Sequence, residues 1–282
     1  DDLPRDLADV LHYFLPELEE STPSPENASE RPAAPVNPGG PPTDFLRRRG
    51  TPSPALPILG LPIGTQDVVR AALAWNLAIE TARLGATTVL LAPESDRGSP
   101  LWPEPGIGPL GCELVFCPAK DVTSLYEAAA EVALKRAGSA KRGGVVFLRI
   151  PPEWIGRDAA PQSLVRWFLL LSAARQDDLS DTLAFARKMV SQHPGAEIGL
   201  SVHGVSSIAE ARKAYESLAK SMRHELSQDL VSYGLLVDDL HVYRAIAAQR
   251  PIGLAHPQSP AARALGDVAR LIYEDARSRV LG

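Results

Sequence analysis

The stretch from Val68 to Pro93, VVRAALAWNLAIETARLGATTVLLAP, decides the fold because it joins a helix to a buried strand. Residues 68–85 are typical of a helix, and Gly85 stands where a glycine often follows the last turn. Residues 87–93, TTVLLAP, form a short continuous apolar run, which indicates a strand buried on both faces. Such a helix and strand in succession predict a parallel sheet.

The same alternation continues on both sides of this stretch. Further short apolar runs predict strands over 55–63, 112–117, 143–152, 166–173, 197–205 and 232–239. Between and after them, helices are expected over 122–138, 178–193, 208–226 and 259–282. We therefore expect an α/β fold of three layers, in which residues 56–282 form one mostly parallel sheet with helices on both faces.

Two short regions precede this domain. Residues 21–55 are expected to form a disordered, extended linker, because 10 of the 26 prolines fall between residues 21 and 57. Residues 1–20 predict a short amphipathic helix, whose apolar side chains recur every three or four positions: Leu3, Leu7, Val10, Leu11, Phe14 and Leu18. A segment this short has no core of its own. It is expected to dock either on the main domain or in the groove of a protein partner.

Composition excludes several classes of function. The net charge of −5 gives no general attraction to nucleic acid or to anionic lipid, and no apolar run is long enough to insert into a membrane. Cys112 and Cys117 are too few for a disulfide framework and are expected to be buried thiols, while the six histidines show no metal-binding spacing. The N-terminus shows no secretion signal, so we expect a cytoplasmic protein, which a partner recruits to the inner membrane or the cell pole.

Residues 76–95, NLAIETARLGATTVLLAPES, carry a resemblance to a known family. A helix with Asn76-Leu77-Ala78 that ends at Gly85 and leads into a VLL strand resembles the MinD/ParA family of deviant P-loop ATPases. The likeness extends to the C-terminal stretch, where a strand, an acidic turn, a helix ending in Gln249-Arg250-Pro251 and the run 259–263, SPAAR, follow in the family's order. It covers about residues 56 to 275, and within the family the regulators of flagellar number are the most similar.

The resemblance also shows what this chain lacks. The family's phosphate loop, GKGGVGKT, falls on residues 64–71, GTQDVVRA, where Gly64 is the only one of the loop's glycines that is retained. Thr65 replaces the signature lysine, and Gln66, Asp67 and Val69 replace loop glycines; Arg70 replaces the phosphate lysine and Ala71 the magnesium-binding hydroxyl. Side chains now occupy positions where glycines let backbone amides surround phosphate. An Asp67 carboxylate about 5 Å from a phosphate costs on the order of 3 kcal/mol.

The family's other functional positions are changed as well. Pro93 falls on the aspartate that follows the second strand, with Glu94 and Asp96 as substitutes if the turn is shifted. Arg149 replaces the Walker B aspartate, and His203 replaces the asparagine that contacts adenine. We therefore expect a degenerate member without catalytic residues, metal ligands or a bound cofactor.

The resemblance implies a non-enzymatic adaptor. It would bind protein partners, partly through its N-terminal helix, and form a homodimer or a heterodimer with a related ATPase. It would position or assemble a bacterial envelope machine such as a flagellum, pilus, division site or polysaccharide exporter. One alternative is a weak ATP-binding switch in which Arg70 still holds phosphate. Another, which the acidic balance disfavours, is a partition protein that binds DNA without sequence preference.

Overall fold

The computed structural model describes Arg5 and residues 55–98, 103–156 and 165–281. The six apolar residues of the N-terminal stripe and most of the linker lie outside the described residues. The expected helix over 1–20 and the expected linker over 21–55 therefore stay predictions. Within the described residues, no helix is both long enough and apolar enough to cross a membrane.

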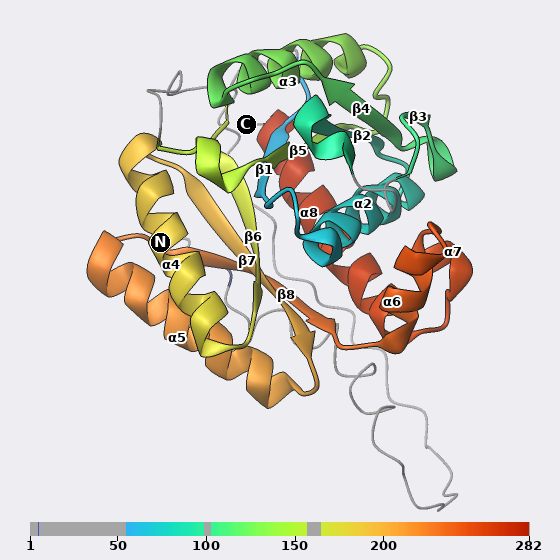
Figure 1. The fold of residues 1–282 in the computed structure, drawn as a ribbon. Coiled ribbons are helices and arrows are strands. Elements are labelled where there is room, and N and C mark those ends of the chain that lie inside the picture. Colours follow the sequence, from blue (N-terminus) through green and yellow to red (C-terminus); the bar gives the residue numbers. More distant parts are fainter. Residues whose placement is uncertain (1–4, 6–54, 99–102, 157–164, 282) are drawn as a thin grey trace, which may run out of the picture.

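Eight strands form one sheet in the order β3-β4-β2-β5-β1-β6-β7-β8 (Figure 1). Their bounds are β1 Ile58–Pro62, β2 Thr87–Pro93, β3 Gly106–Ile107, β4 Glu113–Cys117, β5 Gly144–Ile150, β6 Trp167–Ala173, β7 Glu197–Val205 and β8 Leu230–Val237. All neighbouring pairs are parallel except β3 with β4. This confirms the expected α/β architecture with a mostly parallel sheet.

The helices cover both faces of the sheet. Their bounds are α2 Val68–Arg83, α3 Val122–Ala137, α4 Gln176–Gln192, α5 Ile208–Leu226, α6 Leu240–Ala247, α7 Ile252–Ala255 and α8 Pro260–Leu281. Helices α3, α4 and α5 pack on one face, and α2 and α8 pack together on the other (Figure 1). The crossover through α2 runs toward the β3 edge, whereas those through α3, α4 and α5 run toward the β8 edge, so right-handed connections place α2 on one face and the other three helices on the opposite face.

The sequence missed the smallest elements. Strand β3 has two residues and α7 has four, so neither leaves a periodic pattern to detect. Three turns of 3₁₀ helix, Glu94–Gly98, Pro109–Gly111 and Pro152–Trp154, were also not expected. The longer strands and helices agree with the expected ranges to within a few residues.

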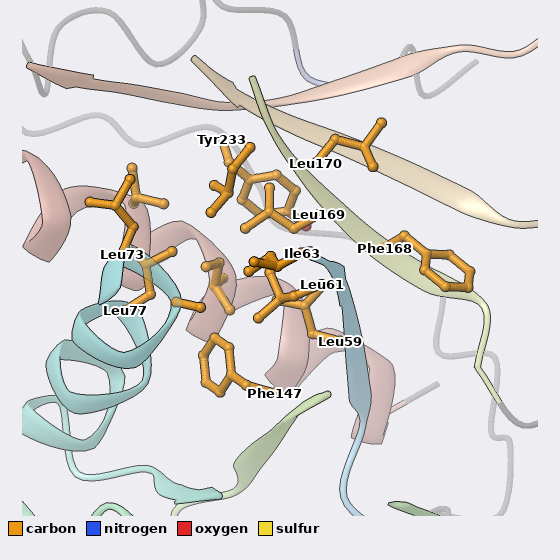
Figure 2. Packing of buried hydrophobic residues seen from close by; sticks show 14 of the residues in the cluster. Leu59, Leu61, Ile63, Leu73, Leu77, Phe147, Phe168, Leu169, Leu170 and Tyr233 are labelled. Carbon is orange, nitrogen blue, oxygen red and sulfur yellow. The ribbon is translucent and has the colours of Figure 1, made fainter. Parts of the chain in front are cut away.

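One hydrophobic core joins the sheet to its helices. Figure 2 shows Leu59, Leu61 and Ile63 facing Leu73 and Leu77 of α2. All five side chains are buried. The final helix, α8, buries an apolar face of Leu265, Val268, Leu271 and Ile272. As expected, Cys112 and Cys117 are buried free thiols.

Replacing Leu77 with alanine tests this core. Leu77 is fully buried on α2, so Leu77→Ala removes buried methyl groups and leaves a cavity. We expect the free energy of unfolding to fall by about 2–5 kcal/mol. Leu134→Ala is the matched control, because Leu134 also lies within a helix but is 54% exposed. Its effect should stay within about 0.5 kcal/mol in urea denaturation, and equal losses for the two variants would contradict the packing described.

Candidate functional site

The turn between β1 and α2 contains only residues 63–67 and has an ordinary backbone. No residue from 63 to 71 has a positive φ angle, and a Cβ added to Gly64 would meet open space. Asp67 caps α2 by accepting a hydrogen bond from the Arg70 amide at 2.9 Å. The amides of Asp67 and Ala71 also donate to carbonyl oxygens within the turn. These backbone donors are satisfied internally rather than directed into an open site.

Arg70 lies at the centre of a network at the carboxyl edge of the sheet. One guanidinium nitrogen, Nη2, donates to both carboxylate oxygens of Asp178 at 2.5 Å, while Nη1 lies 3.2 Å from the Asp67 carboxylate. The third donor, Nε, contacts His203 Nε2 at 3.2 Å. The guanidinium is thus enclosed by two carboxylates and an imidazole of the same chain.

Asp178 is fixed in place by neighbours other than Arg70. It lies in the first turn of α4 and accepts hydrogen bonds from the Ala173 amide at 2.5 Å and from the Ser172 hydroxyl at 3.1 Å. Burial alone would raise the pKa of Asp178, but the hydrogen bonds from Arg70 and from the Ala173 amide outweigh it, and the net pKa is lowered. At neutral pH the carboxylate is therefore charged and neutralises Arg70.

The contact with Arg70 also sets the state of His203. Since Arg70 donates to Nε2, this imidazole nitrogen carries no proton. Burial, followed by the nearby charge of Arg70, lowers the pKa of His203 to about 4. His203 is thus neutral and uses an imidazole nitrogen to bind Arg70.

A second ion pair lies beside the first, wholly inside the protein. Arg149 and Asp96 are both fully buried, with Arg149 Nε 3.1 Å from a carboxylate oxygen of Asp96. Arg149 also donates to the Gly64 carbonyl at 2.9 Å, which ties β5 to the turn after β1. Burial raises the pKa of Asp96 to about 6, although the charge of Arg149 opposes that shift. Asp96 is therefore ionised at neutral pH and compensates Arg149.

The structure brings together most of the residues singled out in the sequence. Asp67 and Arg70 are joined through one network with His203, and Arg149 reaches Gly64 of the same turn. Of the remaining loop residues, Thr65 and Val69 are half-buried, Gln66 is exposed and Ala71 is buried. Among the three candidates after β2, Pro93 is buried within the strand, Glu94 is exposed and Asp96 holds Arg149.

Sequence reasoning missed Asp178. Its only signal was an acidic pair, Asp177-Asp178, at the start of a helix that follows a strand, which is an ordinary way to begin a helix. Trp154, in the 3₁₀ turn after β5, is half-buried and packs against the core. Among the described residues, no group of three or more His, Cys, Asp or Glu side chains is arranged to hold a metal ion.

Comparison with solved structures identifies the fold. A MinC:MinD cell division complex and MinD alone, both from Aquifex aeolicus, match with TM-scores of 0.55 and 0.54 at 16% identity, covering 77% of this chain and 95% and 96% of those chains. MinD from Pyrococcus horikoshii, complexed with Mg-ADP, matches with a TM-score of 0.55 at 12% identity, covering 79% of this chain and 98% of that one. The chain has the MinD fold. No family model and no curated protein matches it in sequence.

Replacing Arg149 tests its buried ion pair with Asp96. Arg149→Met leaves Asp96 buried without a cation, so we expect the free energy of unfolding to fall by about 3 kcal/mol or more at pH 7. Adding Asp96→Asn removes the uncompensated charge and should recover a substantial part of that loss. Chemical denaturation measures both, and a double variant no more stable than Arg149→Met would show that Asp96 does not compensate Arg149.

The neutral state of His203 predicts a pH dependence. An unfolded histidine titrates near pH 6.5, whereas His203 in the folded chain resists protonation down to about pH 4. Between these values the unfolded chain binds the extra proton, so stability is lost as the pH falls. We expect the wild type to lose about 2 kcal/mol more than His203→Asn between pH 7 and pH 4, allowing for partial solvent screening. Parallel stability curves for the two proteins would refute this account.

Proposed function

We propose that this chain is a non-catalytic adaptor with the MinD fold, which binds protein partners and does not turn over nucleotide. The observation that carries the proposal is that its own carboxylates neutralise both arginines at the carboxyl edge. Asp178 and Asp67 enclose Arg70, and Asp96 is paired with Arg149. In a sheet of this type, ligands bind at this edge, beside the turn into the first helix.

Phosphate binding in P-loop proteins needs free backbone amides and an available cation. Here the amides of Asp67, Arg70 and Ala71 already have acceptors on Gly64 and Asp67, in the turn that precedes α2. The Arg70 cation is held by Asp178, whose two carboxylate oxygens both accept from Nη2, so a phosphate would have to compete with Asp178 for this nitrogen. The backbone amides and the Arg70 cation that a phosphate would need are thus already bonded to groups of the same chain. This supports the loss of tight nucleotide binding.

The positions that would hold magnesium in the family also lack oxygen ligands. Ala71 offers only a methyl group and Arg149 a cation where the resemblance would require oxygen ligands. The Asp96 carboxylate is fully buried against Arg149. Hydrolysis by the metal-assisted route of P-loop ATPases therefore lacks its protein ligands, which supports a role without turnover.

The proposed partners are proteins. One of the similar structures, MinD of Aquifex aeolicus, is in a complex with another protein, MinC. By resemblance, the machine served here is a bacterial envelope assembly such as a flagellum, pilus, division site or polysaccharide exporter. Pairing with a second copy or with a related ATPase is the dimer that this proposal includes.

Titration with a fluorescent ATP analogue tests the proposal. We expect the full-length wild type to show no saturable binding up to about 100 μM, the middle of the range in which enzymes commonly bind substrates, with or without magnesium. Magnesium-dependent binding with a micromolar Kd would overturn it and favour the switch in which Arg70 holds phosphate.

A variant with Asp67→Asn and Asp178→Asn is the matched comparator. It keeps Arg70 and retains a side chain able to cap α2, but removes both carboxylates that neutralise the guanidinium. We expect weak, salt-sensitive binding of inorganic triphosphate that the wild type does not show. If neither protein binds triphosphate at low salt, the internal carboxylates are not what excludes it.

A further inference from the structure

Strand β8 is one edge of the sheet, and an edge strand leaves backbone groups without a neighbouring strand. At Ser232 both groups are satisfied by Arg5, 227 positions away in sequence. The Ser232 amide donates to the Arg5 carbonyl at 2.7 Å, and Arg5 Nε donates to the Ser232 carbonyl at 2.8 Å. A residue of the N-terminal segment therefore takes the place of a neighbouring strand at this point.

The rest of the Arg5 side chain binds to α8 and β8. Its two terminal nitrogens donate to the two carboxylate oxygens of Asp275 at 3.2 and 2.8 Å. The guanidinium also lies over the Tyr233 ring, 4.7 Å from its centroid. A two-pronged bond to a carboxylate combined with stacking on a ring is a geometry that arginine provides and lysine does not.

The surface that receives Arg5 is held rigidly from below. Tyr233 lies against Gly199 of β7, where an added Cβ would fall 2.3 Å from the ring. The Tyr233 hydroxyl donates to Asp275 at 2.5 Å and accepts from Trp167 Nε1 at 2.8 Å. Asp275 and Tyr233 are thus fixed by the core, so Arg5 binds a preorganised pair of groups.

A cavity of about 450 Å³ adjoins this contact, which we name the β8-edge cavity. Its lining includes Trp167, Ile198, Val231 and Tyr233. Its charged groups are already paired, Arg5 with Asp275 and Arg279 with Glu197. Charged and apolar side chains share the lining, and because the charged ones already have partners, the aromatic and aliphatic part is the part that an apolar occupant would cover.

The sequence supplies such an occupant. Leu3 and Leu7 stand two positions before and after Arg5, and they begin the apolar stripe of residues 1–20. Once Arg5 is fixed on Ser232 and Asp275, the neighbouring leucines have only a few ångströms of chain to reach the cavity.

We propose that residues 1–20 dock on their own domain along β8, with Arg5 as the anchor and the apolar stripe covering the β8-edge cavity. The segment is then a built-in cover for a sheet edge rather than a free ligand for a partner's groove. This inference does not depend on the absence of nucleotide binding.

Hydrogen exchange in the full-length chain tests the proposal, because the Ser232 amide is protected by the Arg5 carbonyl. We expect Arg5→Ala to speed exchange of that amide at least ten-fold, and Arg5→Lys to have a smaller effect, since lysine keeps the charge but loses the fork and the stacking. The Val146 amide, bonded to Pro57 in the middle of the sheet, reports on global opening and should keep its exchange rate.

Arg175→Ala is the matched control, because Arg175 forms an ion pair with Asp177 but its side chain is 77% exposed. It should leave Ser232 exchange unchanged. The proposal is overturned if Ser232 exchanges in Arg5→Ala as in the wild type, or if Ser232 and Val146 accelerate equally. The first result would mean that the segment is free for a partner, and the second that Arg5→Ala weakens the whole fold.

Discussion

The carboxyl edge of the sheet is dominated by one constraint, the need to neutralise two arginines close to each other. In a parallel sheet the strands end at the same edge, and the N-termini of the following helices add partial positive charge there. Arg70 and Arg149 add two full cations to this field, and Arg149 is completely buried. An unpaired buried charge costs several kcal/mol, so the surrounding chain must supply carboxylates.

The local structure follows from that requirement. Asp67 caps α2 and contacts Arg70, so one side chain both begins the helix and offsets the charge. Asp178 lies at the start of α4, where the Ala173 amide and the Ser172 hydroxyl donate hydrogen bonds that hold its carboxylate beside Arg70. Asp96 is buried in a turn after β2 because its partner, Arg149, is there. A short turn without a positive φ angle connects β1 to α2.

How much of this could be read from the sequence depends on the range of the signal. Continuous apolar runs such as residues 87–93 fixed the strands, because burial on both faces leaves a composition that is visible locally. Residues 64–71 and Arg149 were found by aligning the sequence with the motifs of the family that it resembles. The pairing of Arg70 with Asp178 joins residues 108 positions apart, and a helix-starting aspartate looks the same with or without such a partner. Asp96 was a candidate only as a substitute acid, and its role became clear once β5 placed Arg149 against it.

The contacts of Arg5 and of Arg70 lie toward opposite ends of the strands. Trp167 and Glu197, beside the β8-edge cavity, are the first residues of β6 and β7, whereas Ala173 and His203, beside Arg70, lie at or near the ends of those strands. The Arg5 contact therefore lies at the other end of these strands from the Arg70 network. A partner that approaches the carboxyl edge would meet a surface whose charges are already balanced, so its binding would rest on shape and apolar contact more than on charge.

The same balance shows what a nucleotide would have to overcome. A triphosphate at the turn after β1 must displace Asp178 from Arg70, which leaves a carboxylate, still bonded to the Ala173 amide, beside the incoming phosphates. Asp67 cannot withdraw without uncapping α2. Each retained carboxylate then repels the ligand by on the order of 3 kcal/mol at about 5 Å, and two of them exceed what one arginine contact returns. In the proposed adaptor, the carboxylates that pair with Arg70 are thus also the groups that would repel a phosphate brought to the same guanidinium.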